Sequence, residues 1–208
     1  MKFRKATLED LDCISGIYDR IHDGIENGQL VIGWKRDIYP TRETARAAII
    51  AGDMFVELDN GVIVASGRIN QEQVDVYADV TWDYPAPDDK VMVLHTLTVD
   101  PVSMRKGYGS AFVAFYEDYA SEHGCPYLRM DTNGMNTVAR KLYNTHGYKE
   151  VGIVPCVFNG IPGVPLVMLE KKNEYVDTIN KEAKGLSGDT EWGVHCYRDK
   201  HTGRTGTG

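Results

Sequence analysis

The sequence predicts an α+β domain built around a mixed β-sheet, and two patterns carry this prediction. Residues 55–58 and 62–69 are apolar runs on either side of Asp59-Asn60-Gly61, an arrangement typical of a β-hairpin. Residues 91–99 and 127–131 have the composition of strands and enclose a helix, a unit expected to be parallel and right-handed. A sheet that holds both an antiparallel hairpin and a parallel unit is a mixed sheet.

The first half of the chain predicts two helices before the hairpin. The first starts at a threonine cap, Thr7, and has apolar side chains at helical spacing. The second is rich in alanine, and a segment with glycines, aromatic residues and Pro40 separates the two. The expected elements are, in order, a strand at residues 2–5, a helix at 8–23, an irregular loop at 26–40, a helix at 41–51 and, after the hairpin, a strand at 74–80 and a loop at 85–89.

The second half predicts two more helices that pack on the sheet. The helix inside the strand–helix–strand unit has one apolar face, formed by Phe112, Phe115, Tyr116 and Tyr119. The expected elements after that unit are a helix at 136–146 and two strands, at 149–154 and 165–171, around a turn at 159–163. Residues 1–172 are therefore expected to form one domain, and residues 173–208 a polar, partly flexible extension.

Composition narrows the class of protein. The chain has 208 residues, 42% of them hydrophobic, which suits one well-cored domain. Its formal net charge of -7 argues against nucleic acid or an anionic membrane as a partner. Four widely spaced cysteines predict neither a metal site nor a disulfide framework. With no apolar run of membrane-spanning length and no apolar leader in its first ten residues, the sequence predicts a soluble cytoplasmic protein.

Residues 104–112, Met-Arg-Lys-Gly-Tyr-Gly-Ser-Ala-Phe, raise the question of a phosphate site. Unpaired N–H groups and the helix dipole favour an anion at a helix N-terminus. Gly107 and Gly109 would let a phosphate approach the backbone, and Arg105 and Lys106 add cationic donors. On these residues alone, a phosphate grip and a plain glycine-eased turn are about equally supported.

Two nucleotide-binding motifs fit this turn poorly. A Walker A loop ends in Gly-Lys followed by Ser or Thr, whereas Gly109 is followed by Ser110 and Ala111. A dinucleotide fingerprint needs a third small residue where this chain has Phe112. Asp131 does end the next strand, as a ribose-binding acid would, so the dinucleotide alternative is weakened rather than excluded.

Three stretches together resemble the GNAT superfamily of N-acetyltransferases. They are Leu-His-Thr-Leu-Thr-Val-Asp-Pro at 94–101, the glycine turn at 104–110, and Asn-Thr-Val-Ala-Arg-Lys-Leu-Tyr-Asn-Thr-His-Gly-Tyr at 136–148. The family's signature is [Q/R]-x-x-G-x-[G/A] after a strand, followed by N-x-x-A-x-x-L-Y-x-x-x-G-[F/Y]. This chain departs from it at Met104, where the family has Gln or Arg. The likeness extends more weakly over residues 3–171.

The resemblance implies a central mixed sheet with helices on both faces and acetyl-CoA as co-substrate. It further implies that two neighbouring strands splay apart, which opens a V-shaped slot for the cofactor. Backbone amides of the glycine turn would hold the pyrophosphate, and the strand edge at 97–99 would pair with the pantetheine arm. The implied cofactor-binding residues are Leu97, Thr98, Val99, Arg105, Lys106, Gly107, Tyr108, Gly109, Ser110 and Asn136.

Direct acetyl transfer to an amine needs a proton acceptor, a proton donor and a stabilised oxyanion. By the resemblance, Tyr143 is the donor to the leaving thiolate, which suits a phenol of pKa about 10 against about 8.5 for a thiol. His95 stands where many members have a glutamate, and it or a chain of waters would be the base. A backbone amide near Leu97 would face the oxyanion. Tyr143 could instead be one more packed aromatic, and His95 a polar residue of the strand face.

Acceptor choice is expected to depend on aromatic residues of the variable loops. Trp34 and Tyr39 lie in the loop where the family builds its acceptor wall, and Tyr77 and Trp82 belong to the strand predicted at 74–80 and to the loop that follows it. Each could equally be ordinary packing. The predicted function is N-acetylation of a small-molecule amine through a ternary complex. The alternatives are a non-catalytic acyl-CoA-binding module and a protein or peptide N-acetyltransferase. A homodimer is also expected, because homodimers are common in the family.

Overall fold

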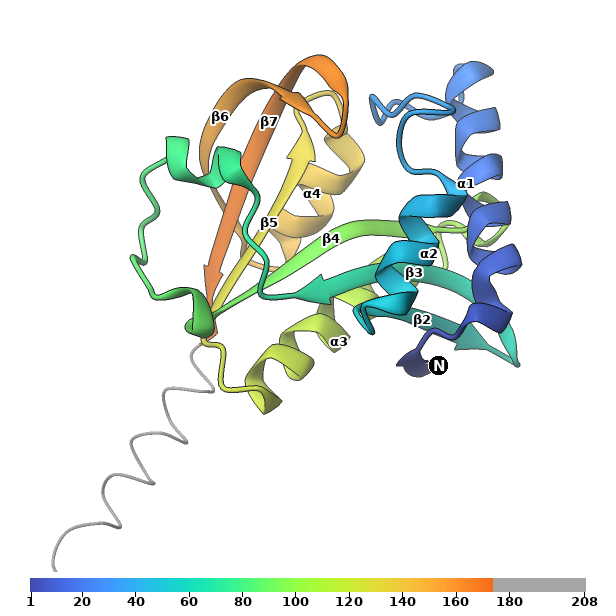
Figure 1. Cartoon of the computed structure of the whole chain (residues 1–208), viewed down its shortest axis with the longest axis horizontal. Coiled ribbons are helices and arrows are strands. Elements are labelled where there is room, and N and C mark those ends of the chain that lie inside the picture. Colours follow the sequence, from blue (N-terminus) through green and yellow to red (C-terminus); the bar gives the residue numbers. More distant parts are fainter. Residues whose placement is uncertain (174–208) are drawn as a thin grey trace, which may run out of the picture.

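The computed structural model describes residues 1–173, and the expected α+β fold is confirmed. One seven-stranded sheet has the order β1-β2-β3-β4-β5-β7-β6 (Figure 1). Only β4 and β5 run parallel, and every other neighbouring pair is antiparallel. The strands are β1 (Lys2–Lys5), β2 (Met54–Asp59), β3 (Val62–Asn70), β4 (Val91–Val99), β5 (Tyr127–Asn133), β6 (Lys149–Phe158) and β7 (Ile161–Lys172).

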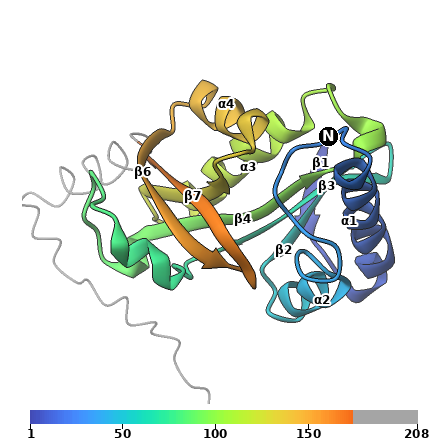
Figure 2. The same ribbon diagram turned by 90° about the horizontal axis from the view of Figure 1, so that it is seen from above.

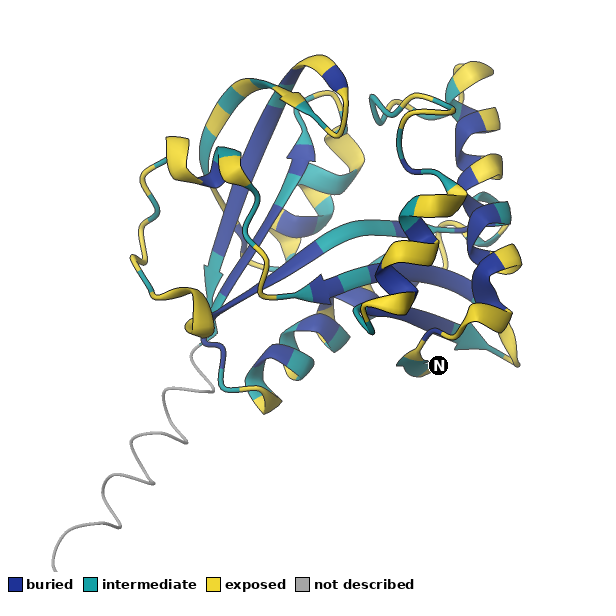
Figure 3. Cartoon of the chain, in the orientation of Figure 1, coloured by how far each residue is buried: buried dark blue, intermediate teal, exposed yellow. Residues whose placement is uncertain are grey.

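Helices cover both faces of the sheet, as Figure 2 shows. Side chains of α1 (Leu11–Glu26) and α2 (Arg42–Ile50) form one core cluster with the β2 residues Met54 and Val56. Side chains of α3 (Tyr108–Glu122) and α4 (Thr137–Thr145) form another with Phe55, on the opposite face. Because β2 alternates between the two clusters, its residues are buried on both faces (Figure 3).

The sheet is divided by a gap between its two parallel strands. Pairing of β4 with β5 covers only residues 91–94 and 127–130, and its last pair is Leu94 with Met130. Beyond that pair, β4 continues along β3 to Val99, and β5 continues along β7 to Asn133. Figure 1 shows the two strands diverging as a V. The splayed pair that the family resemblance implies is therefore present.

Residues 74–80 do not form the predicted strand. They contain a 3-10 helix, η2 (Asp75–Asp79), which follows Val74. Both sides of β3 are already occupied, by β2 and by β4, so no free edge is available to a strand that follows it. The segment crosses the sheet face instead, and Val74, Tyr77 and Val80 pack at threefold spacing against β4, β6 and β7.

The final hairpin is longer than predicted. β6 and β7 extend to the two-residue turn Asn159–Gly160, whose φ values of 49° and 77° fit a type I′ hairpin turn. Pro165 does not interrupt β7, because the ladder with β5 begins one residue later, at Leu166. The predicted C-terminal extension from residue 174 onward lies outside the described residues.

A buried ion pair fastens residues 71–90 to the sheet. Arg129 of β5 donates to Glu170 of β7 at 3.3 Å, and both side chains are at most 5% exposed. Arg129 also donates to the side chain of Gln73 and, at 3.1 Å, to the carbonyl of Tyr84, while its guanidinium lies 3.9 Å from the ring centre of Trp82. Residues from both ends of the segment therefore converge on one cation.

Glu57 of β2 is fully buried, and neither carboxylate oxygen has a hydrogen-bond partner among residues 1–173. Burial raises the pKa of Glu57 from 4.5 to about 7, helped by the nearby Asp59 and opposed by the N-terminal amino group. The raised pKa means that Glu57 favours the folded state below pH 4.5 and that this contribution is lost as pH rises through 7.

We therefore expect Glu57→Gln to stabilise the protein at pH 8, by about 1–3 kcal/mol in the free energy of unfolding, and to do little at pH 5. Urea unfolding at both pH values measures the difference. Glu122→Gln, at an exposed glutamate of α3, is the control and should match the wild type at both. Equal stabilities of Glu57→Gln and wild type at pH 8 would contradict the expectation.

Candidate active site

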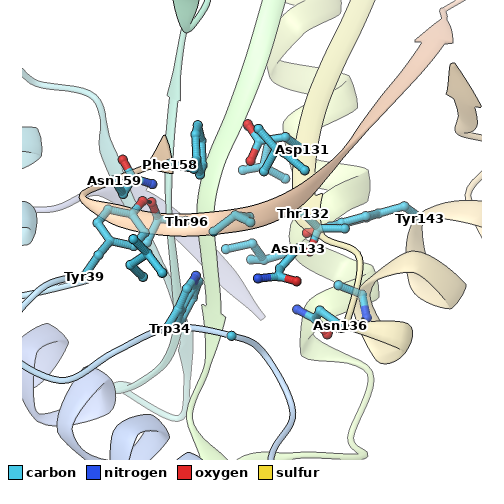
Figure 4. A pocket seen from close by; sticks show the side chains of 17 residues that line it. Trp34, Tyr39, Thr96, Asp131, Thr132, Asn133, Asn136, Tyr143, Phe158 and Asn159 are labelled. Atoms are coloured by element: carbon cyan, nitrogen blue, oxygen red, sulfur yellow. Dashed lines mark hydrogen bonds between the residues drawn. The ribbon is translucent and has the colours of Figure 1, made fainter. Parts of the chain in front are cut away.

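The candidate site lies in the slot between β4 and β5. A pocket of about 80 Å³ is lined by Leu94 and Leu97 of β4, by the end of β5, and by Asn136, Ala139 and Tyr143 of the α4 side (Figure 4). A larger cavity, of about 610 Å³, adjoins it on the face of α2. We call this second cavity the acceptor cavity, because Tyr39 of the expected acceptor wall lines it. The slot and the acceptor cavity share five lining residues: Tyr39, Thr96, Asp131, Phe158 and Asn159.

A β-bulge lies in β4 at the centre of the slot. His95 pairs with Arg68 and Thr98 with Ser66, so Gly67 alone faces both Thr96 and Leu97. Thr96 has a φ of 51°, which turns the chain out of regular pairing. A Cβ atom at Gly67 would lie 2.8 Å from the ring of Phe112, so glycine at this position lets α3 pack closely on β3 opposite the bulge. The bulge thus brings Leu97 to the slot wall, beyond the last pair with β5.

The glycine turn has the features of an anion site. Gly107, at φ 88°, is the N-cap of α3, and a Cβ atom there would meet nothing within 4 Å. Within residues 1–173, the backbone amides of residues 105–110 donate to no backbone carbonyl, and neither Arg105 nor Lys106 has an ion-pair partner. Open space, free amides and two exposed cations converge at one helix terminus.

The other residues of this turn serve the fold more directly. Tyr108 is buried and donates to Asp59 at 2.6 Å, so only its backbone faces outward. Gly109 permits close packing, because a Cβ atom there would lie 3.3 Å from Leu142 of α4. Ser110 lies 2.7 Å from His146 Nε2, and Met104 is partly exposed. Thr98 turns its hydroxyl toward Ser66, at 2.8 Å, so it could contribute to the slot only through its backbone.

α4 supplies Asn136 and Tyr143 to the slot. Asn136 caps the helix by accepting from the Ala139 amide at 3.1 Å, and its Nδ2 group has no partner within residues 1–173. Tyr143 is 6% exposed and lines the pocket, and its hydroxyl makes no hydrogen bond to the described residues. Burial, and to a lesser degree Asp131, raises the pKa of Tyr143 well above its usual value. The phenol is therefore protonated at neutral pH.

His95 lies in the acceptor cavity rather than in the slot. Its Nε2 is 3.0 Å from Asn70 Oδ1, an oxygen that can only accept, so Nε2 carries the proton. Burial, and then the charge of Arg68, lowers the pKa of His95 to about 4. The ring is neutral at physiological pH and a weak base.

Asp131 is a site residue that the sequence reasoning did not select. It lines both the slot and the acceptor cavity, and it accepts a 2.9 Å hydrogen bond from Tyr77. Burial raises the pKa of Asp131 to about 6, partly offset by that hydrogen bond. The available signal was its place at the end of β5, two residues after Arg129 and therefore on the same face of the sheet.

Of the four aromatic residues predicted at the acceptor wall, two reach the pocket. Trp34 and Tyr39 line the slot and contact each other edge to face, 6.0 Å apart. Tyr39 also forms a short hydrogen bond with Thr96 (Figure 4), and burial raises its pKa to about 12. Tyr77 and Trp82 line neither cavity. They pack behind Asp131 because η2 lies across the sheet face where a strand was expected.

Two contacts close over the slot. Gly33 of the α1–α2 loop packs directly on Asn133, since a Cβ atom there would lie 2.2 Å from Asn133 Nδ2. Gly160, at the tip of the β6–β7 hairpin, lies close to Ile38 of the α1–α2 loop, since a Cβ atom added at Gly160 would be 3.3 Å from Ile38 Cγ2. The α1–α2 loop therefore lies against both the end of β5 and the tip of the β6–β7 hairpin.

Residues 25–148 match the sequence model of the acetyltransferase (GNAT) family. The chain belongs to the GNAT acetyltransferase family. A curated relative, the uncharacterized N-acetyltransferase YhfO of Bacillus subtilis (strain 168), is 34% identical over 61 residues. That stretch is 29% of this chain and 41% of YhfO, so less than half of the relative is matched.

Solved structures share the GNAT fold. An acetyltransferase of the GNAT family from Streptococcus agalactiae 2603 gives a TM-score of 0.67 at 21% identity, over 82% of this chain and 94% of that one. YncA of Salmonella typhimurium, solved with its cofactor acetyl-CoA, gives 0.59 at 17% identity, over 83% and 93%. At these identities the likeness shows the fold alone.

Within residues 1–173, no group of three or more His, Cys, Asp or Glu side chains is placed to hold a metal ion, and no helix is long and apolar enough to cross a membrane. The described residues do fit the family's acyl-CoA ligand. The glycine turn could hold a pyrophosphate, and the unpaired part of β4 leads from that turn toward the slot.

We expect Gly107→Ala to weaken CoA binding about tenfold, because an alanine resists a φ of 88° and the turn would change shape. Isothermal calorimetry with CoA measures the effect. Gly124→Ala is a matched control, since Gly124 has a φ of 68°, equal open space, and a place just beyond the opposite end of α3. Both variants should lose similar stability, about 1 kcal/mol. Equal CoA affinity in the two would argue against this site.

Proposed function

We propose that this protein is an acetyl-CoA-dependent N-acetyltransferase that acts on a small-molecule primary amine. The observation that carries the proposal is the placing of Asp131 and Tyr143 on one pocket from opposite faces of the sheet. Asp131 lies on the face of the acceptor cavity, and Tyr143 belongs to α4 on the other face. The family membership supports the reaction class, and bound acetyl-CoA would supply an acetyl thioester.

Asp131 is the better-placed group to take a proton from the amine. It lines the passage between the two cavities, whereas His95 lies in the acceptor cavity alone. With a pKa near 6, Asp131 is ionised at pH 7 and is more basic than an ordinary aspartate. With a pKa near 4, His95 is the weaker base, and a role in binding the acceptor suits it better.

Tyr143 is suited to the opposite proton transfer. Its hydroxyl has no partner in residues 1–173, so it can donate to a thiolate that leaves within the slot. Its raised pKa keeps it protonated over the whole range in which Asp131 is ionised. Tyr143 would donate a proton on the face of α4, and Asp131 would accept one on the face of the acceptor cavity. With both groups in place, the acetyl group can pass directly to the amine, without an enzyme-bound acetyl group.

The shape of the acceptor cavity favours a small amine with an apolar body. Its α2 side consists of Thr44, Ala47, Ala48 and Ala51, and Phe158 also lines it. Within the described residues, the close approaches of Gly33 to Asn133 and of Gly160 to Ile38 argue against an extended polypeptide as the acceptor. The sharpest test measures thiol release from acetyl-CoA with polyamines, amino acids, aminoglycosides and a lysine peptide. Turnover with none of them, together with intact CoA binding, would favour a non-catalytic acyl-CoA-binding module.

Asp131→Asn is expected to lower kcat/KM at pH 7.5 by about 10²–10⁴-fold and to abolish the acidic limb of the pH profile near pH 6. In the wild type, activity falls as pH drops through that value, because Asp131 becomes protonated. Asp79→Asn changes an exposed carboxylate on the same segment as Tyr77 and should leave the profile intact. A normal acidic limb in Asp131→Asn would remove Asp131 from this role.

Tyr143→Phe is expected to lower kcat by about 10–10³-fold while CoA affinity changes little, because only the hydroxyl is lost. Pre-steady-state thiol release isolates the chemical step. Tyr148→Phe is the paired control: its ring lies 6.3 Å from that of Tyr143, but it does not line the pocket. Similar rates in the two variants would mean that the Tyr143 hydroxyl takes no part in the chemistry.

A further inference from the structure

We propose that Tyr77 is a positioning residue for Asp131: its hydroxyl fixes one carboxylate oxygen, leaves the other for the acceptor amine, and sets the pH range of proton acceptance. This proposal rests on the function proposed above for Asp131. It assigns a role to a residue that reaches neither cavity itself and that a sequence pattern would place at the acceptor wall.

The contact is specific to one oxygen. Tyr77 donates to Asp131 Oδ2 at 2.9 Å, and Tyr77 is 3% exposed. Oδ1 of Asp131 has no hydrogen-bond partner within residues 1–173, yet it is not among the sealed polar atoms of the interior. Tyr77 therefore occupies one oxygen from the same face of the sheet, and the other oxygen remains accessible from the pocket side.

Tyr77 has little freedom to move away from this position. The Trp82 ring meets its ring edge to face at 5.1 Å, and Trp82 Nε1 donates to the Tyr77 carbonyl at 3.0 Å. Trp82 in turn lies on the guanidinium of Arg129, which is held by Glu170. Arg129 and Asp131 are two residues apart in β5, so the strand that carries the carboxylate also anchors the segment that delivers its partner.

In the part of the chain that the structure describes, no cation forms an ion pair with Asp131. The ionisable groups that act on it are Tyr77 from η2, Tyr39 from the α1–α2 loop, Tyr143 from α4 and Cys156 from β6, all neutral at pH 7. Further along the acceptor cavity lie the paired Arg68 and Glu72, and the neutral His95. The Tyr77 hydroxyl is accordingly the one direct hydrogen-bond donor to the charged form of Asp131 within the described chain.

The test compares Tyr77→Phe with the wild type in two measurements. The first is the pH dependence of kcat/KM with the best amine of the panel. The second is a ¹³C NMR titration of the Asp131 carboxyl carbon, assigned with Asp131→Asn, which needs no activity. Loss of the donor should move both the acidic limb and the titration upward by about 0.5–1 pH unit. kcat/KM should then fall about two- to fivefold at pH 6 and stay unchanged at pH 8.

A matched control and an opposite perturbation guard against a purely structural effect. Tyr84 belongs to the same segment, but it joins the Arg129 cluster through its backbone, and its side chain is 40% exposed. Tyr84→Phe should leave both measurements unchanged. Tyr77→3-fluorotyrosine provides a more acidic phenol, donates a stronger hydrogen bond, and should move both measurements downward.

The possible results separate two claims, the positioning role of Tyr77 and the proposed acetyl transfer. Shifts of opposite sign in Tyr77→Phe and Tyr77→3-fluorotyrosine, in proteins of wild-type melting temperature, would establish the positioning role. A Tyr77→Phe protein with an unshifted titration would overturn it, whether or not the enzyme turns over. An absence of turnover with every amine, combined with a shifted titration, would refute the proposed reaction but not the Tyr77–Asp131 contact.

Discussion

The parting of β4 and β5 after Leu94 and Met130 is the constraint on which the rest of the molecule depends. Up to that pair the strands share a parallel ladder, and beyond it each follows its other neighbour. The bulge at Thr96 and the long β5–β7 ladder hold the gap open from its two sides. Since a gap in a sheet connects the two layers that the sheet otherwise separates, side chains from opposite faces meet there.

The two faces of the sheet contribute different chemical groups to the gap between β4 and β5. On one face α3 and α4 bring backbone amides and a phenol, whereas on the other a 3-10 helix and a loop bring a phenol to a carboxylate. The loop side is fixed by the buried pair of Arg129 and Glu170. Removing two charges from water is costly, and this cost is offset only because Arg129 also binds Gln73, Tyr84 and Trp82. The buried ion pair therefore lies close to the gap, because Arg129 is two residues from Asp131 in β5.

Local chemistry made much of this structure predictable. Short stretches of the sequence predict the hairpin turns, the helix caps and the apolar face of α3. The glycine turn and the stretch Asn136–Tyr148 together indicate the family. The strand predicted at 74–80 was wrong, because alternation cannot show that β3 already has two neighbours. The sequence pattern does not identify Asp131 as a site residue, for a related reason. Its raised pKa comes from burial, and burial depends on Tyr77, a residue 54 positions away in the sequence.

The closure of the slot by Gly33 on Asn133 and Gly160 on Ile38 bears on inhibitor design. Compounds that imitate an acyl-CoA would be directed at the glycine turn, which belongs to the signature shared by the whole family, so selectivity would be hard to achieve. In this protein the acceptor cavity is lined by residues of α2, whereas the slot is lined by Asn136, Ala139 and Tyr143 on the α4 side. A ligand in the acceptor cavity would meet the Arg68–Glu72 pair and the alanine face of α2. Selective recognition could thus be sought without any nucleotide mimicry.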